Sequence, residues 1–212
     1  MSHCFPPSAN NVSTQKNNLI PKKVGVFVWR AKRKRLPVLV ELDKRGVDLN
    51  SVRCPLCDDT LESVEHTLFS CVHAKVVWEK VYNWWGNLTS LGGFDDAFDG
   101  KFNTQASILG AKIWQAVQWT TGYLIWKNRN QKVFKNSSWS PPMALNEIQV
   151  KSYDWVAKRC KSKKIEWHDW LNNPISVILN RNQRHEILTS YWSAYDNDMA
   201  QMELNEQRCI SC

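Results

Sequence analysis

The 212-residue sequence has no apolar run long enough to cross a membrane. A membrane-spanning helix needs about 20 consecutive apolar residues, so a transmembrane segment is excluded on length and no membrane partner is expected. The N-terminus also lacks a basic stretch followed by an apolar one, because residues 1–18 are polar and rich in asparagine. Without that secretory signal we expect a soluble intracellular protein, in the nucleus or the cytoplasm.

The cysteines do not form an even set, since there are seven of them, so they cannot all pair in disulfides. In a reducing compartment, clustered cysteines are more often metal ligands. Four ligand-type residues follow the pattern C-x2-C-x8-H-x4-C, and they are Cys54, Cys57, His66 and Cys71. This Cys₃His set matches the tetrahedral preference of zinc and leaves no position open for water. The spacing therefore predicts one structural Zn²⁺ ion.

Other candidate ligands compete less well with these four. His73 lies two residues after Cys71 and is the alternative to His66. We favour His66 because a helix predicted over residues 61–70 turns it inward. The pair Cys209 and Cys212 has no further partner at zinc spacing, so ordinary thiols are expected there.

The apolar residues recur at helical spacing in most of the chain, which predicts a mainly α fold. Helices are expected over residues 22–35, 37–45, 61–70, 72–85 and 107–134, and another is expected to start after Pro141. The predicted architecture is a small zinc-stapled helical domain followed by a helical C-terminal region.

Composition divides the chain into five predicted segments. They are a disordered leader (residues 1–20), a zinc-binding domain (21–86), a linker rich in glycine and aspartate (87–103), a helical basic region (104–175) and a poorly ordered tail (176–212).

Residues 22–85 resemble the zinc-binding domain that follows the polymerase in the reverse transcriptases of plant non-LTR retrotransposons. The motifs that carry the resemblance are Val-Phe-Val-Trp29-Arg-Ala, Arg35-Leu-Pro37, Lys44-Arg-Gly46, Cys54-Pro-Leu-Cys57, Glu65-His66, Phe69-Ser-Cys71 and Trp78. The resemblance implies the same four zinc ligands that the spacing selects. Val38 departs from the pattern, since many relatives carry threonine there.

The polymerase chemistry of such reverse transcriptases is not visible in this sequence. Their paired aspartates follow an aromatic residue on a hairpin, and the run Phe94-Asp-Asp-Ala97 only imitates that motif. It lies in a predicted acidic loop without a strand pattern, whereas two-metal phosphoryl transfer needs carboxylates that converge from a rigid fold. We therefore expect a fragment of an RNA-directed DNA polymerase polyprotein that performs no catalysis itself.

Charge is distributed in alternating blocks. Residues 22–53 hold ten basic and three acidic side chains, residues 54–100 hold two and eight, and residues 101–164 hold twelve and two. Basic blocks of this kind are typical of contacts with phosphates of RNA or DNA, although they also suit the C-terminal ends of helices. The candidate nucleic-acid-binding residues are Arg30, Lys32, Arg33, Lys34, Arg35, Lys158, Arg159, Lys161, Lys163 and Lys164.

The sequence favours an accessory nucleic-acid-binding module of a retrotransposon reverse transcriptase. One alternative is a protein-interaction module whose tryptophan-rich surfaces dock the polymerase domain. Another is an inactive fragment of an element. The sequence leaves the choice between RNA and DNA open.

Overall fold

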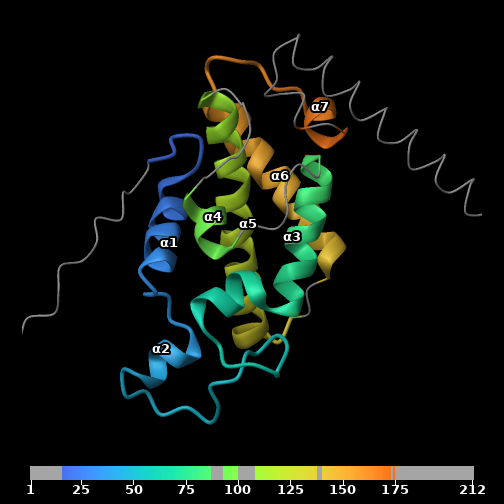
Figure 1. Cartoon of the computed structure of the whole chain (residues 1–212). Helices are drawn as coiled ribbons and strands as arrows, with labels where there is room; N and C mark the ends of the chain where they lie inside the picture. Colours follow the sequence, from blue (N-terminus) through green and yellow to red (C-terminus); the bar gives the residue numbers. More distant parts are fainter. Residues whose placement is uncertain (1–15, 87–92, 100–107, 138–139, 173, 175–212) are drawn as a thin grey trace, which may run out of the picture.

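The computed structural model describes residues 16–86, 93–99, 108–137, 140–172 and 174, and this part of the chain is mainly helical (Figure 1). The predicted mainly α fold is confirmed. Strand-like pairing among these residues is limited to an isolated bridge between Arg53 and Leu61. Within the same ranges, no helix is both long and apolar enough to cross a membrane.

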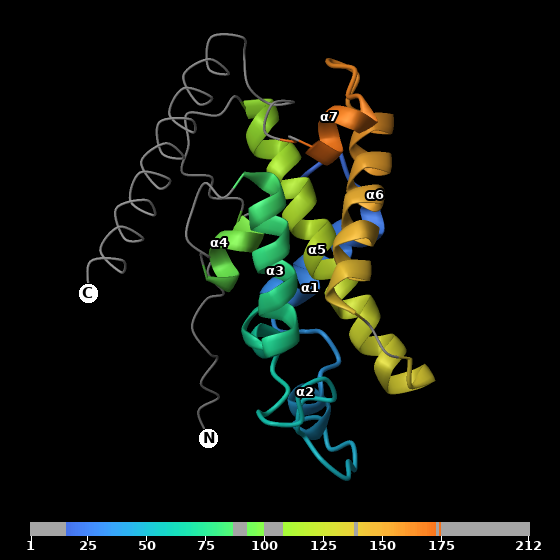
Figure 2. The ribbon, with the colours of Figure 1, turned by 90° about the vertical axis from the view of Figure 1, so that its right-hand side faces the viewer.

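The described residues form eight helical elements, and the longest of them, α5, lies at the centre (Figures 1 and 2). The central helix is α5, which packs against α1, α4, α6 and the short element η1. The bounds are α1 Lys22–Lys32, α2 Leu39–Asp43, η1 His66–Ser70, α3 Val72–Trp85, α4 Phe94–Asp99, α5 Ile108–Lys135, α6 Pro141–Arg159 and α7 Trp167–Asn172.

Helix α5 is buried on nearly every side, which explains its central place. Its buried residues include apolar Ile113 and Val117 and also polar Thr120 and Thr121. Each threonine hydroxyl donates a hydrogen bond to the carbonyl four residues earlier, at 2.6 and 2.9 Å. These bonds satisfy hydroxyls that would otherwise be costly to bury. The helix predicted over residues 107–134 is therefore confirmed as a core helix.

Helix α4 lies within the segment predicted as a linker, where an acidic loop was expected. Phe98 of α4 is fully buried and its ring lies 4.8 Å from that of Phe94. Gly122 of α5 allows the Phe98 ring to pack closely against that helix, because a Cβ atom at residue 122 would lie 2.6 Å from the ring. The expectation of a loop at residues 94–97 was wrong, because Phe98 anchors the helix in the core.

The described structure begins before the expected start at Pro21. Leu19 and Ile20 are buried, and the Asn17 side chain donates hydrogen bonds to the Lys112 carbonyl and the Gln115 side chain at 2.8 and 3.0 Å. The end of the predicted disordered leader is therefore ordered against α5. Residues 1–15 of that leader, the linker residues 87–92 and 100–103, and the tail 176–212 lie outside the described residues.

A single hydrophobic core connects the metal-binding segment with the C-terminal helices. Leu68 of η1 and Trp78 of α3 belong to the same buried cluster as Ile148 of α6 and Trp170 of α7. The Trp78 indole donates a hydrogen bond to the Leu68 carbonyl at 2.8 Å, which ties η1 to α3. The predicted domain boundaries remain predictions, but the two regions pack as neighbours.

A buried ion pair joins the metal-binding segment to α5. Glu62 and Arg129 are 0% and 3% exposed, and the Arg129 Nε atom donates to Glu62 at 2.6 Å. The same carboxylate accepts the Leu39 backbone N–H at 2.7 Å, at the start of α2. Arg129 belongs to the basic block of residues 101–164, for which phosphate contacts or a place at the C-terminal end of a helix were considered. Neither applies to Arg129, because its side chain is inside the protein.

We expect Glu62→Gln to lower the free energy of unfolding by about 3–5 kcal/mol, because it leaves the Arg129 charge buried without its partner. The double variant Glu62→Leu/Arg129→Met should lose less than the sum of the two single changes. Denaturant unfolding of the zinc-loaded protein measures both quantities.

The exposed pair Glu41 and Lys44, 2.8 Å apart, supplies the matched control. Glu41→Gln should cost about 0–1 kcal/mol, as for other surface pairs. Equal losses for Glu41→Gln and Glu62→Gln would contradict the structural role of the buried pair.

Candidate metal centre

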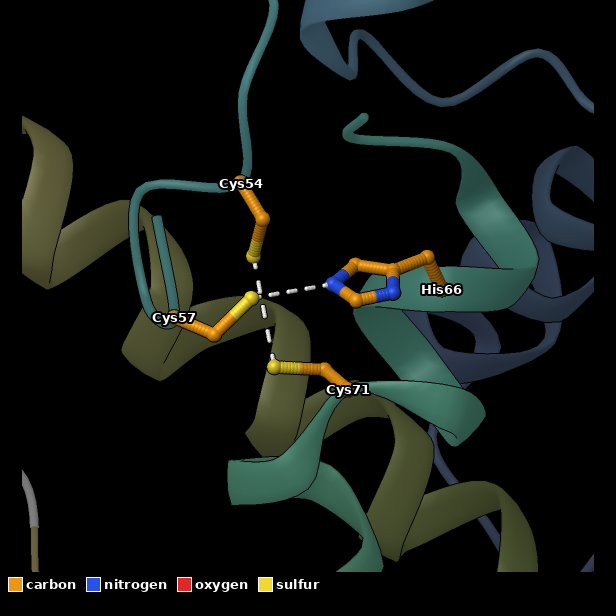
Figure 3. Close-up of side chains that lie close together, drawn as sticks. All are labelled: Cys54, Cys57, His66 and Cys71. Atoms are coloured by element: carbon orange, nitrogen blue, oxygen red, sulfur yellow. Dashed lines mark hydrogen bonds between the residues drawn. The ribbon is translucent and has the colours of Figure 1, made fainter. Parts of the chain in front are cut away.

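The four predicted ligands lie together in space (Figure 3). Their ligand atoms are all within 4.8 Å of one another. The Sγ atoms of Cys54 and Cys71 are 4.0 Å apart, and Cys57 Sγ lies 3.4 Å from His66 Nε2. Bonds of about 2.3 Å to sulfur and about 2.0 Å to nitrogen require tetrahedral neighbours about 3.5–3.8 Å apart. The site therefore fits a zinc ion with only a small contraction.

A tight turn presents the first two thiols. The Asp58 N–H donates to the Cys54 carbonyl at 2.8 Å, and Asp58 adopts a left-handed backbone with φ +54°. The Cys54 N–H donates to the Thr60 carbonyl at 2.8 Å, which closes the loop beside the Arg53–Leu61 bridge. These bonds hold both sulfurs on the same side of the turn.

The other two ligands flank a π-helical turn. Element η1 runs from His66 to Ser70, and the Cys71 N–H donates to the His66 carbonyl at 2.8 Å. An α-helix has about 3.6 residues per turn and would carry residue 71 away from the face of residue 66. An i→i+5 turn brings them together. The structure confirms that His66 lies on a helical segment, but this segment spans His66–Ser70 and not the predicted residues 61–70, and its π form explains the H-x4-C spacing.

Burial makes this a closed site. Cys54 and Cys71 are fully buried, His66 is 8% exposed and Cys57 is half-buried. Val64 and Leu68 next to the site are buried, while Phe69 is half-buried with its ring 5.5 Å from that of Trp78. With four protein ligands and an apolar surround, the site suits a structural metal.

The sulfur atoms of Cys54 and Cys71 lie 4.0 Å apart and shift each other's pKa in opposite directions. The hydrogen bond to Cys71 and burial raise the pKa of the Cys54 thiol well above its ordinary value. The same hydrogen bond lowers the pKa of Cys71, against the opposing effect of burial. Backbone amides at the start of α3 favour the Cys71 thiolate as well. Metal binding must therefore release at least the proton on Cys54.

The competing histidine does not reach the site. His73 lies exposed in the first turn of α3, and the metal-ligand cluster found among the described residues contains His66 instead. Cys160 is buried elsewhere, with its sulfur 3.6 Å from the Ser162 hydroxyl. Cys4, Cys209 and Cys212 lie outside the described residues.

Most residues of the two basic clusters are at the surface. The exposed ones are Arg30, Arg33, Lys34, Arg35, Lys158, Arg159, Lys161 and Lys164, whereas Lys32 and Lys163 are half-buried. Lys158 pairs with Asp154 at 2.6 Å and Lys164 with Glu166 at 2.7 Å, so part of the second cluster is neutralised. Trp155, which precedes this cluster in the sequence, is only 9% exposed, so it offers little surface for stacking against a base.

The structure brings one residue of each cluster to the same groove. Lys32 and Arg159 both line a groove of about 900 Å³ beside α1, together with Lys16, Lys22 and Trp29. Sequence reasoning did not select Lys16, Lys22 or Trp29. A signal was present, since Val26 and Trp29 are apolar yet lie off the buried stripe of α1.

Comparison with protein families shows what this segment is similar to. Residues 7–78 match the family described as zinc-binding in reverse transcriptase. This part of the chain is similar to a reverse-transcriptase zinc-binding domain. The matched range includes all four ligands, so the predicted resemblance and the single structural Zn²⁺ are confirmed. Searches of curated proteins and of solved structures give no match.

In this zinc-binding domain, we expect Cys71→Ser and His66→Ala to abolish stoichiometric zinc binding and to lower helicity, because each removes a ligand of a closed site. The controls Cys160→Ser and His73→Ala should retain one zinc per chain. Elemental mass spectrometry and circular dichroism measure the two effects. A folded parent without zinc would contradict the assignment.

Zinc retention should fall as the pH falls, because protons compete with the metal for the cysteine sulfurs and for His66. The raised pKa of the Cys54 thiol explains why retention falls and does not rise at lower pH, since this sulfur readily takes back its proton when the metal leaves. Release to a colorimetric chelator, followed from neutral to acidic pH, tests this. Release that is independent of pH would argue against thiolate ligation.

Proposed function

We propose that this chain is an accessory nucleic-acid-binding module of a retrotransposon reverse transcriptase, of the non-LTR kind found in plants, without catalysis of its own. The zinc-binding domain match supports the origin. The polymerase domain of the same element is the protein partner that this origin suggests. The site of action would be the nucleus or cytoplasm, where template RNA and target DNA are found.

One observation carries the binding part of this proposal. The groove beside α1 has four cationic side chains among its described lining residues and no acidic one, and these cations are Lys16, Lys22, Lys32 and Arg159. The exposed residue Arg30 in the last turn of α1, and Lys34 and Arg35 just after that helix, add further positive charge. Cations grouped in this way attract phosphates and release the counterions that surround them.

Zinc has an indirect role in this mechanism. It holds the turn of Cys54 and Cys57 against η1 and α3, and the core helices then position the basic surface. Lysine and arginine contacts to phosphates fix position without reading the base sequence. The module would therefore hold template RNA or target DNA with little dependence on sequence.

Binding to a fluorescent oligonucleotide should weaken as salt rises. If four phosphates of a single strand are neutralised, affinity should fall about 50-fold between roughly 50 and 200 mM salt. Fluorescence anisotropy with the zinc-loaded chain measures this slope.

The variant Arg35→Glu/Lys161→Glu should weaken binding more than the control Lys75→Glu/Lys151→Glu, which makes the same charge change at exposed positions outside the clusters. No measurable binding, or association that does not depend on salt, would contradict nucleic-acid recognition.

A further inference from the structure

The groove beside α1 has an apolar interior as well as a cationic rim. It lies between the segment of residues 16–21, α1 and the end of α6, and it is lined by Ile20, Val26, Trp29 and Trp119 besides its cations (Figure 1). Trp119 is 5% exposed and its indole donates to the Phe98 carbonyl at 3.1 Å. Trp119 therefore forms the base of the groove. Trp29 is half-buried, so part of its ring is accessible to a ligand.

Helix α1 presents apolar residues on two faces. Val24, Phe27, Val28 and Ala31 form its buried face. Val26 is 52% exposed, and it lines the groove with Trp29. A surface helix needs only one apolar stripe to pack against its core. The second stripe is therefore not explained by folding of the described core.

The space in front of this second stripe is open. Gly25 lines the groove one helical turn before Trp29, and a Cβ atom added there would have no neighbour within 4 Å, so the space beside it is open. The Arg33 guanidinium lies 4.9 Å from the centre of the Trp29 ring. This guanidinium covers one face of the indole, so a stacking base would take the other face or displace the arginine, and the cation would attract the phosphates beside that base.

The cationic rim and the aromatic wall of the groove together indicate which kind of ligand it binds. A single strand offers both repeated phosphates and exposed flat bases, which suit a cationic rim and an aromatic wall. A duplex offers its phosphates but keeps its bases stacked inside, so it would leave Trp29 and Val26 uncovered. The rim cations favour an anionic ligand over a purely apolar peptide.

We propose that this groove binds a short single-stranded segment of RNA or DNA. Lys16, Lys22 and Arg159 contact its phosphates, and one base stacks against Trp29. This inference rests on the proposed nucleic-acid function and adds a strand preference and a named stacking residue.

The test uses the full zinc-loaded chain and three labelled probes, namely oligouridylate, oligothymidylate and a mixed-sequence duplex. Trp29→Ala should weaken single-strand binding about 5- to 150-fold, the range that stacking of one base supplies. Trp29→Phe should retain most of the affinity, because a ring remains. The two single-stranded probes show whether RNA or DNA is preferred.

Charge reversal provides a second variant that leaves the core intact. Lys22→Glu/Arg159→Glu should weaken single-strand binding at least 10-fold, and Lys75→Glu/Lys151→Glu should weaken it less, since all four positions are exposed. Zinc content and circular dichroism confirm the fold of each variant. If Trp29→Ala does not fold, the comparison of Trp29→Phe with Trp29→Leu replaces it.

Different failures have different meanings. If binding depends on salt and all these variants reduce it equally, the groove is not the binding site. The proposed function as a nucleic-acid-binding module would then still hold. Tighter binding to duplex than to single strands would lead to the same conclusion. No binding to any probe would overturn both. A concentration-dependent dimer that Val26→Glu dissociates would show that a second copy covers the groove, and would also overturn the proposal.

Discussion

Two polar anchors hold the segment that carries the first half of the metal site. Between Val38 and Val64 the structure buries only Cys54 and Glu62, so this stretch has almost no apolar core of its own. One anchor is a metal ligand and the other forms the ion pair with Arg129. Structural zinc contributes on the order of 10 kcal/mol to the folding of small domains, whereas one buried aliphatic side chain contributes about 1.5–3 kcal/mol. The metal therefore replaces several core residues in this segment.

The anchors also connect the metal to the central helix. If the metal-binding turn detaches, Glu62 can leave Arg129, and a buried guanidinium then remains in the core of α5 without its carboxylate. Loss of the metal therefore destabilises the core of α5 as well as the four ligands. The groove beside α1 contains none of those ligands, so the metal affects the groove only through the stability of the shared core.

Local features of the structure could be predicted from the sequence, and long-range ones could not. The ligands Cys54, Cys57, His66 and Cys71 follow from spacing, because a turn and a helical segment bring close residues together. The bounds of α3 and α5 follow from apolar periodicity within one or two residues. The pair of Glu62 and Arg129 spans 67 residues, and no periodicity reports such a partner. A clue did exist, since Arg129 lies one turn after buried Ile125, at a position where a charge requires a buried partner.

The burial of the tryptophans changes the balance between the functional alternatives. A docking module was suggested by tryptophan-rich surfaces, yet Trp78, Trp85, Trp114 and Trp170 are at most 3% exposed and build the core. The exposed cations and the apolar stripe of Val26 and Trp29 remain as the surface features that need a function. Lys158 and Lys164 pair with carboxylates, whereas the exposed residues Arg30, Lys34 and Arg35 at the end of α1 form no ion pair within the described part of the chain. We infer that phosphates are attracted first to that end of α1, and that the groove extends the contact along the same helix.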